Sequence, residues 1–291
     1  MRIDAHQHFW RYRPSDYPWI TDGMDALKRD WLPRDLHPLL KRHGIDACIA
    51  VQARATEAET DFLLDLAAAH DWIAAVVGWV DLTAGDLEAR LARWDGKAKL
   101  AGFRHPIQDE ADVAGFLRNP RLRSGVALLQ RQQRVYELLV HAHQLEAAAD
   151  FSAAAGGHHL VLDHLGKPAI RERGHDEWRR RLRPFKNLSH VVCKLSGLVT
   201  EAVSDRGRYD EGEIMRYLET ALELFGPRRL MFGSDWPVCL LAAPYDAVYR
   251  LMEILAEQLS TDERSDVFGG TAARCYALDL RAGERNDRSA G

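Results

Sequence analysis

The feature that most constrains the fold is a repeated alternation of short apolar segments with longer amphipathic ones. Several of the apolar segments are rich in valine and isoleucine and are flanked by turn residues, as buried parallel strands are. The eight segments are Ile3–His8, Ala47–Gln52, Ile73–Val80, Leu100–Ile107, Tyr136–Val140, Leu160–Leu165, Val191–Ser196 and Leu230–Asp235. Eight strand–helix repeats in 291 residues predict an α/β protein, a single-domain (β/α)8 TIM barrel.

Two of the intervening segments show how the helices are recognised. Thr56–His70 has acidic residues near its start and apolar residues at helical spacing. Asp210–Phe225 is similar and is followed by Gly226 and Pro227, which together end a helix. We expect the barrel to occupy residues 1–280 and the polar residues 281–291 to form a disordered tail.

Composition narrows the class of partner. The chain carries 39 lysines and arginines against 43 aspartates and glutamates, a net charge of −4, and this balance gives no basic surface for nucleic acid. The four cysteines are widely spaced, which indicates buried free thiols and a reducing compartment. No apolar run is long enough to span a membrane. The first residues form a strand rather than a signal peptide, so we expect a cytoplasmic protein; the oligomeric state is unknown.

Polar residues cluster where the predicted strands end. Functional sites of TIM barrels lie at the carboxyl ends of the strands. Burying polar groups costs free energy unless they are paired, so polar ends on seven of the eight strands indicate function rather than stability. The residues are His6, His8, Gln52, Arg104, His105, His141, His143, Asp163, His164, Lys194, Ser196, Ser234 and Asp235.

The spacing of the first two histidines favours a shared site. Residues i and i+2 of a strand point to the same side, so His6 and His8 leave the strand together. Such a pair suits a metal ion or a developing negative charge. By the same alternation we expect Asp163 to point toward the helices when His164 points inward. The roles of His141 and His143 stay open.

An aromatic segment follows the first strand. Residues 11–32 lack clear periodicity and include Tyr17, Trp19 and Trp31. A loop at this position lies over the mouth of the barrel. The sequence leaves two interpretations open: a lid over the substrate or a loop packed onto the barrel rim.

Several motifs together resemble the amidohydrolase superfamily, in particular the sugar-lactonase branch of its amidohydrolase 2 group. The matching stretches run from Arg2 to about Leu280 and are Asp4-Ala-His-Gln-His-Phe-Trp10, Gly102-Phe-Arg-His-Pro106, Leu162-Asp-His-Leu-Gly-Lys-Pro168, Cys193-Lys-Leu-Ser-Gly197 and Met231-Phe-Gly-Ser-Asp-Trp-Pro237. Metal-dependent members usually place a carboxylated lysine or a glutamate on the fourth strand. This chain has Arg104 there, whose charge opposes a dinuclear metal centre.

The resemblance implies an ester hydrolase that opens a sugar-acid lactone, with L-fucono-lactone as the expected substrate and L-fucose degradation as its context. Asp235 is then the general base, and His6, His8 and His164 are its catalytic companions. The predicted sugar contacts are Gln52, Arg104, His105, Lys194 and Trp19. The cofactor is either one divalent ion, zinc, on His6, His8 and Asp235, or none.

Three alternatives remain from the sequence. The substrate is another aldonolactone such as L-rhamnono-lactone, and the ring size is not determined. A metal-dependent decarboxylase of a neighbouring branch would use the same histidine pair and Asp235. A barrel that binds a sugar acid without turnover is the non-enzyme alternative.

Overall fold

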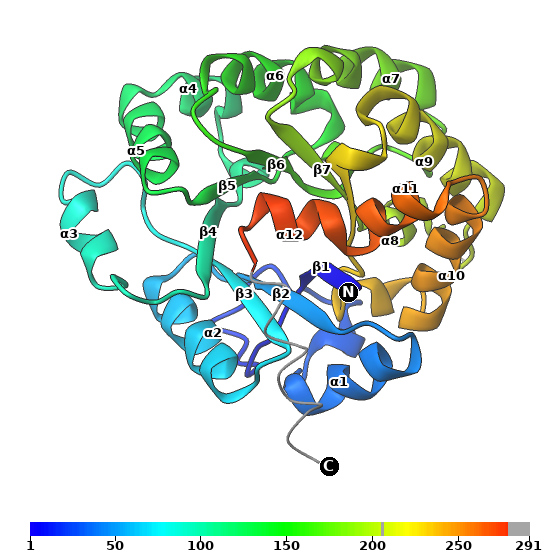
Figure 1. Cartoon of the computed structure of the whole chain (residues 1–291), viewed down its shortest axis with the longest axis horizontal. Helices are drawn as coiled ribbons and strands as arrows, with labels where there is room; N and C mark the ends of the chain where they lie inside the picture. Colours follow the sequence, from blue (N-terminus) through cyan, green and yellow to red (C-terminus); the bar gives the residue numbers. More distant parts are fainter. Residues whose placement is uncertain (205–206, 279–291) are drawn as a thin grey trace.

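The computed structural model describes residues 1–204 and 207–278, which form a barrel of parallel strands surrounded by helices (Figure 1). The eight strands neighbour one another in chain order. They are β1 Ile3–Gln7, β2 Ala47–Val51, β3 Ile73–Gly78, β4 Leu100–His105, β5 Val135–Leu138, β6 Leu160–Leu162, β7 Val191–Leu195 and β8 Leu230–Phe232. The predicted (β/α)8 barrel is confirmed, and the predicted tail 281–291 lies outside the described residues.

The sheet closes through the residues that follow β8. The backbone N–H of His8 donates to the carbonyl of Trp236 at 2.7 Å, and the N–H of Asp235 donates to the carbonyl of His6 at 2.8 Å. Closure therefore joins the two ends of the chain that carry the predicted catalytic residues.

The helices form the outer layer of the barrel (Figure 1). Two of them match the predicted segments closely: α2 begins after Thr56, whose side chain accepts a hydrogen bond from the N–H of Glu59, and α9 begins after Asp210. The helices are α1 Pro33–Arg42, α2 Glu57–Ala69, α3 Leu87–Ala92, α4 Val113–Arg118, α5 Pro120–Arg131, α6 Leu145–Ala154, α7 His175–Leu182, α8 Leu198–Ala202, α9 Glu211–Phe225, α10 Tyr245–Ala256, α11 Thr261–Ser265 and α12 Thr271–Cys275.

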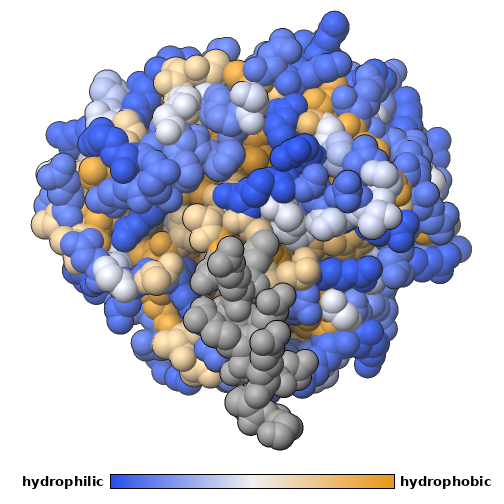
Figure 2. Space-filling model, viewed as in Figure 1, coloured by the Kyte–Doolittle hydropathy of each residue, from blue (hydrophilic) through white to orange (hydrophobic). Residues whose placement is uncertain are grey.

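Two large hydrophobic cores shape the barrel. One lies between the strands and the helices. The other fills the barrel interior with side chains such as Ile49, Val77 and Val161, together with Ala272 of α12 and Tyr276, which follows that helix. Figure 1 shows α12 lying across the middle of the barrel, and Figure 2 shows that hydrophilic residues predominate around the periphery of this face. Gly269, just before α12, packs against Met1 at the start of β1, so α12 covers the amino-terminal end of the barrel and the carboxyl ends of the strands lie at the opposite end.

Membrane insertion has no support among the described helices. None of them combines the length and the apolar character that crossing a bilayer requires.

Candidate functional site

A β-bulge in β1 orients the two histidines. Asp4 pairs with Cys48 and Gln7 with Ala50, so β1 carries one extra residue between these pairs. Ala5 packs in the inner core, and His6 also faces the interior. Regular alternation from Ala5 would have sent both histidines toward the helices. After the bulge they point inward together, with their Nε2 atoms 3.2 Å apart.

Asp235 reaches the same point from the end of β8. Gly233 allows the close approach, since a Cβ atom there would lie 2.6 Å from the Cβ of His6. Asp235 adopts a left-handed backbone conformation, with φ at 57°. Its Oδ1 atom lies 3.4 Å from His8 Nε2 and 3.7 Å from His6 Nε2. The predicted meeting of His6, His8 and Asp235 is therefore present.

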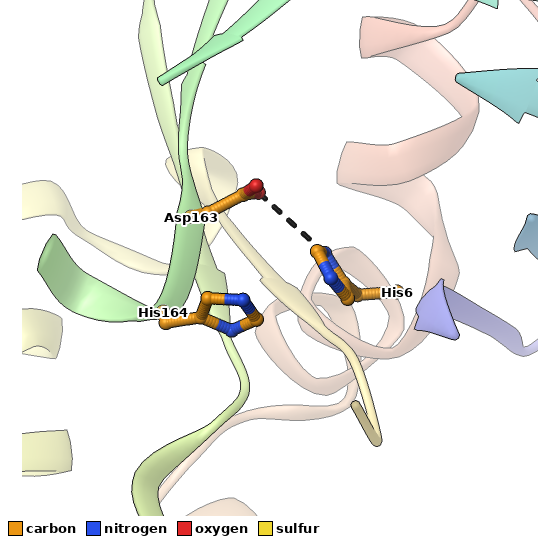
Figure 3. A group of neighbouring side chains, drawn as sticks. All are labelled: His6, Asp163 and His164. Carbon is orange, nitrogen blue, oxygen red and sulfur yellow. Dashed lines mark ion pairs between the residues drawn. The ribbon is translucent and has the colours of Figure 1, made fainter. Parts of the chain in front are cut away.

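Asp163 and His164 both face the interior, which corrects the expectation that Asp163 points toward the helices (Figure 3). β6 ends at Leu162, so Asp163 continues the inward alternation begun by Val161. His164 then enters the left-handed region with φ at 53°, which turns its side chain inward as well. Its ring centroid lies 4.4 Å from that of His6.

β7 and the turn after it support the His164 ring. Ser196 Oγ lies 2.8 Å from His164 Nδ1. Gly197 has φ at 71°, and a Cβ atom there would lie 2.8 Å from the same nitrogen. This glycine therefore provides both a backbone conformation and the room that the His164 ring occupies.

A layer of buried charges lies beneath these residues. Lys194 Nζ is 2.7 Å from Glu137 Oε2, 3.3 Å from Asp163 Oδ1 and 3.1 Å from His6 Nδ1. Arg104 Nη1 donates to Asp163 Oδ2 at 3.1 Å and lies 3.3 Å from His6 Nε2. Lys194, Glu137 and Asp163 have no exposed surface. The two cations and two carboxylates balance one another in charge.

Glu137 is a member of this layer that was not among the predicted site residues. The signal was available, because alternation in β5 places Val135 and Glu137 inside the barrel while Tyr136 and Leu138 pack against the helices. Tyr276, just after α12, also donates a hydrogen bond to Glu137. The barrel floor is thereby connected to the charged layer.

Burial and neighbouring charges set the protonation states of this layer. Burial and the nearby Lys194 ammonium hold the pKa of His6 well below its usual range. Burial also raises the pKa of Glu137 to about 7. Burial alone would raise the pKa of Asp163, but Lys194 and the other neighbouring cations hold it well below its usual range. His6 is therefore neutral and Asp163 is ionised at neutral pH.

His164 and Asp235, which lie above this layer, also have pKa values shifted by burial and by neighbouring groups. Burial lowers the pKa of His164 to about 4. Burial would raise the pKa of Asp235, but its interactions with His164 and His8 lower it below its usual value. A neutral imidazole and an ionised carboxylate therefore stand together, and the carboxylate is able to accept a proton.

A cavity of about 830 Å³ opens above this group. Most predicted substrate and catalytic residues line it: His8, Trp19, Gln52, Arg104, His164 and Asp235. His6 and Lys194 lie below its wall. His105 does not line it either, because its ring stacks on Phe116 and its Nε2 lies 2.7 Å from Glu110. His141 and His143 stack on each other outside the lining.

The aromatic segment combines both interpretations drawn from the sequence. Tyr17 and Leu27 are buried in a small core with Trp10, which packs the segment onto the rim. Trp19 lines the cavity, and its Nε1 donates to the carbonyl of Ala53 at 2.9 Å. The segment is thus a rim-packed loop that also supplies part of the cavity wall.

Other charged residues also line the wall, among them Arg54, a polar residue just beyond the predicted second strand. Arg54 pairs with Asp16 at 3.0 Å, which ties the end of β2 to the aromatic segment. Lys167 and Glu201 line the opposite region, from the turn after His164 and from α8. Lys167 belongs to the motif around His164, whereas nothing in the sequence pattern marks Glu201.

The donor atoms of His6, His8 and Asp235 fit one divalent metal ion. All three ligand atoms lie within 4.8 Å of one another. Ligands held about 2.0–2.1 Å from a tetrahedral zinc ion stand about 3.3 Å apart, close to the 3.2, 3.4 and 3.7 Å separations here. His8 Nδ1 lies 2.8 Å from the carbonyl of Val51, which orients Nε2 toward the site.

A second ion has less support. His6, Asp163 and His164 form another group of potential ligands (Figure 3). However, it shares His6 with the first group, and Asp163 is already committed to Arg104 and Lys194. The positive charges of these two residues oppose a dinuclear centre.

Comparisons with known proteins agree with this geometry. The amidohydrolase family model matches residues 3–278. An L-fucono-1,5-lactonase of Burkholderia multivorans is 55% identical, covering 98% of this chain and 99% of the relative. An L-fucono-1,5-lactonase of Burkholderia ambifaria is 35% identical, with 98% of each chain covered.

The structural comparison gives the same result. A crystal structure of an amidohydrolase from Burkholderia multivorans with bound zinc is 56% identical, with a TM-score of 0.93, and the match covers 96% of this chain and 100% of that one. The resemblance inferred from the motifs is therefore confirmed: this chain belongs to the amidohydrolase family.

Proposed function

We propose that this protein hydrolyses L-fucono-1,5-lactone to the free aldonic acid. The 55% identity to a curated L-fucono-1,5-lactonase over nearly the whole chain supports this substrate and favours a lactonase over the decarboxylase alternative. Opening of the lactone adds water across the ester bond between C1 and the ring oxygen.

The observation that carries the mechanism is the ionised Asp235 carboxylate at the wall of the cavity. Asp235 accepts a proton from the attacking water as its oxygen bonds to C1. The bond from C1 to the ring oxygen then breaks, and the proton passes to that oxygen, which becomes a hydroxyl group. Positioning the water and carbonyl side by side supplies a large part of the acceleration.

The carbonyl oxygen gains negative charge during attack, so donors must face it. His164 and Arg104 line the cavity near Asp235 and are the proposed hydrogen-bond donors to this oxygen, whereas His8 spends its Nδ1–H on the Val51 carbonyl and turns Nε2 toward His6 and Asp235. Gln52 and Trp19 are the proposed contacts to the rest of the lactone. His105 and Lys194 do not line the cavity, since each is paired with a carboxylate, and we do not propose that they contact the lactone directly.

We further propose zinc as the ion held by His6, His8 and Asp235. The separations of their ligand atoms and the zinc-bound relative support this choice. A divalent ion bound there would lower the pKa of a water molecule and polarise the carbonyl. Metal analysis of protein purified without added metal, followed by chelation and re-addition of zinc, tests the requirement.

The Asp235→Asn variant tests the general base. Loss of a positioned base lowers the rate by about 10²- to 10⁴-fold, so we expect kcat to fall in that range. The assay follows acid release from L-fucono-1,5-lactone, corrected for spontaneous hydrolysis. Asp65→Asn, an exposed position on α2, is the matched control and should keep the wild-type rate. Near wild-type activity in Asp235→Asn would remove Asp235 from this role.

A further inference from the structure

The charged side chains that line the cavity differ in how far they are committed to other groups. Asp16 and Arg54 pair with each other, and Asp109 accepts a hydrogen bond from Gln108. Arg104 and Asp235 belong to the buried network and the histidine group described above. Lys167 and Glu201 are different: among residues 1–204 and 207–278, neither has a side-chain hydrogen bond or close ion pair.

The backbone holds these two residues firmly at the wall. Lys167 has φ at 46°, and its N–H donates to the carbonyl of His164 at 2.8 Å. Glu201 lies on α8, directly after the Gly197 turn that supports His164. The N–H of Arg171 donates to the carbonyl of Glu201 at 3.1 Å, which ties the two segments together. Both side chains therefore start from the same backbone turns that position the His164 ring.

Their surroundings make the lack of partners informative. Lys167 and Glu201 are only partly exposed. Burial raises the pKa of Glu201, and the nearby Lys167 charge only opposes this effect. The Glu201 carboxylate lines the cavity without a donor from the described residues, so its oxygens are free to accept hydrogen bonds from a ligand there. A substrate in the cavity would be such a ligand.

We propose that Glu201 and Lys167 form the subsite that binds the ring hydroxyl groups of the sugar lactone. The carboxylate is able to accept hydrogen bonds from two hydroxyl groups, and the ammonium donates to hydroxyl oxygens. A pair of opposite charges suits this ligand because the lactone itself is neutral. The inference rests on the proposed lactonase activity and assigns the part of the site that distinguishes a sugar from a simple lactone.

The test compares lactones that differ in their hydroxyl groups. Wild-type protein is first assayed on L-fucono-1,5-lactone, on its singly deoxygenated analogues and on δ-valerolactone, which has none of the hydroxyls. The least hydroxylated lactone that is hydrolysed becomes the reference substrate. If no lactone in the panel is hydrolysed, the proposed function itself fails, and this result is distinct from a failure of the subsite.

The variants are Glu201→Gln and Lys167→Met, with Glu88→Gln, at an exposed position on α3, as the control. Loss of a hydrogen bond to a charged group predicts a fall of about 10- to 100-fold in kcat/KM for L-fucono-1,5-lactone. Because the contact exists before and during the reaction, the fall should appear mainly as a higher KM. On a lactone that lacks the hydroxyl groups bound by Glu201, the loss of kcat/KM in Glu201→Gln should be at least about threefold smaller than on L-fucono-1,5-lactone.

Two results would overturn the proposal. One is an equal loss on both substrates, which would assign Glu201 to folding or to the chemical step. The other is an unchanged KM for L-fucono-1,5-lactone in both variants. Equal melting temperatures for Glu201→Gln and wild type establish that the protein compared is folded.

Discussion

Replacing Lys194 by methionine is the sharpest test of the buried charge layer. The ammonium has no exposed surface and lies 2.7 Å from Glu137 and 3.3 Å from Asp163. Methionine fills a similar volume but removes the charge, and it leaves two carboxylates with one fewer cation. Breaking a buried ion pair by removing one partner destabilises proteins by about 3–5 kcal/mol.

The structure places the expected cost near the lower end of that range. Asp163 keeps its contact with Arg104 at 3.1 Å, so it stays ionised in the variant. Glu137 loses its main cation, and its pKa then rises above the value of about 7 that it has beside Lys194. Uptake of a proton by Glu137 limits the loss of stability. We therefore expect Lys194→Met to lower the free energy of unfolding by about 3 kcal/mol at pH 8.

The pH dependence distinguishes this mechanism from a simple packing defect. In the wild-type protein Glu137 is protonated below its pKa of about 7, so Lys194 pairs there with only one ionised carboxylate, Asp163. Above that pH the ionised pair forms, and only the wild type benefits from it. The loss of stability caused by Lys194→Met should therefore grow as the pH rises from 5.5 to 8.

Equilibrium urea unfolding at pH 5.5 and pH 8 measures these differences. Adding Glu137→Gln to the Lys194→Met variant removes the unpaired carboxyl and should restore roughly 1–2 kcal/mol at pH 8. Lys41→Met, at an exposed position on α1, is the control and should change stability by less than about 0.5 kcal/mol. Equal destabilisation at the two pH values, with no recovery in the double variant, would refute the reasoning.

Three further predictions concern other parts of the site. Burial raises the pKa of Asp4 to about 6, so ionising it opposes folding; stability should fall as pH rises from about 4 to 6, and Asp4→Asn should flatten this slope in unfolding experiments. Gly197→Ala strains a left-handed turn and crowds His164, which should lower stability by about 1–2 kcal/mol. At a temperature where the variant is fully folded, steady-state assays should still show kcat at least about tenfold below the wild-type value, because the His164 ring is displaced. Because the pKa of Asp235 is lowered and that of His164 is about 4, kcat/KM should stay level from pH 5 to 8; an acid limb centred near pH 6 would contradict this assignment.

The strands and the outer helices were predictable because burial leaves a direct mark on composition. A strand covered on both faces must be apolar throughout, and segments such as Ala47–Gln52 carry this pattern. The ends of the strands were less certain. β6 stops at Leu162 because the next residues turn through left-handed conformations, although the apolar pattern continues to Leu165.

At the strand ends, the simple alternation of side chains does not predict which way every residue points. His6 and His8 do point together, but they face the interior only because of a bulge that no residue type announces. Strand alternation predicts that Asp163 points toward the helices if its neighbour His164 points toward the barrel interior. Both are inside, since alternation no longer holds once the backbone leaves the strand.

The ion-pair partners of Lys194 were not predicted from the sequence, for a different reason. Its contacts come from β5 and from the end of β6, and their meeting depends on the register of the closed barrel. Residue type indicated only that a lysine near a strand end needs a polar partner, which a substrate hydroxyl would also satisfy. A carboxylate inside β5 was the competing partner, and the alternation of that strand identifies Glu137 as a candidate.

The position of the charged layer explains how neutral and ionised groups coexist so close together. Asp163 stays ionised because Lys194 and Arg104 flank it, and burial together with the Lys194 charge lowers the pKa of His6 and keeps it neutral. Nε2 of His6, Nε2 of His8 and the Asp235 carboxylate meet at the cavity end of the barrel. The buried charges thus prepare the site for an electron-poor centre, either a metal ion or a carbonyl carbon with its attacking water. The charged layer therefore sets the protonation states of the site, and substitutions within it that leave the protein folded should still change the pH profile of the reaction.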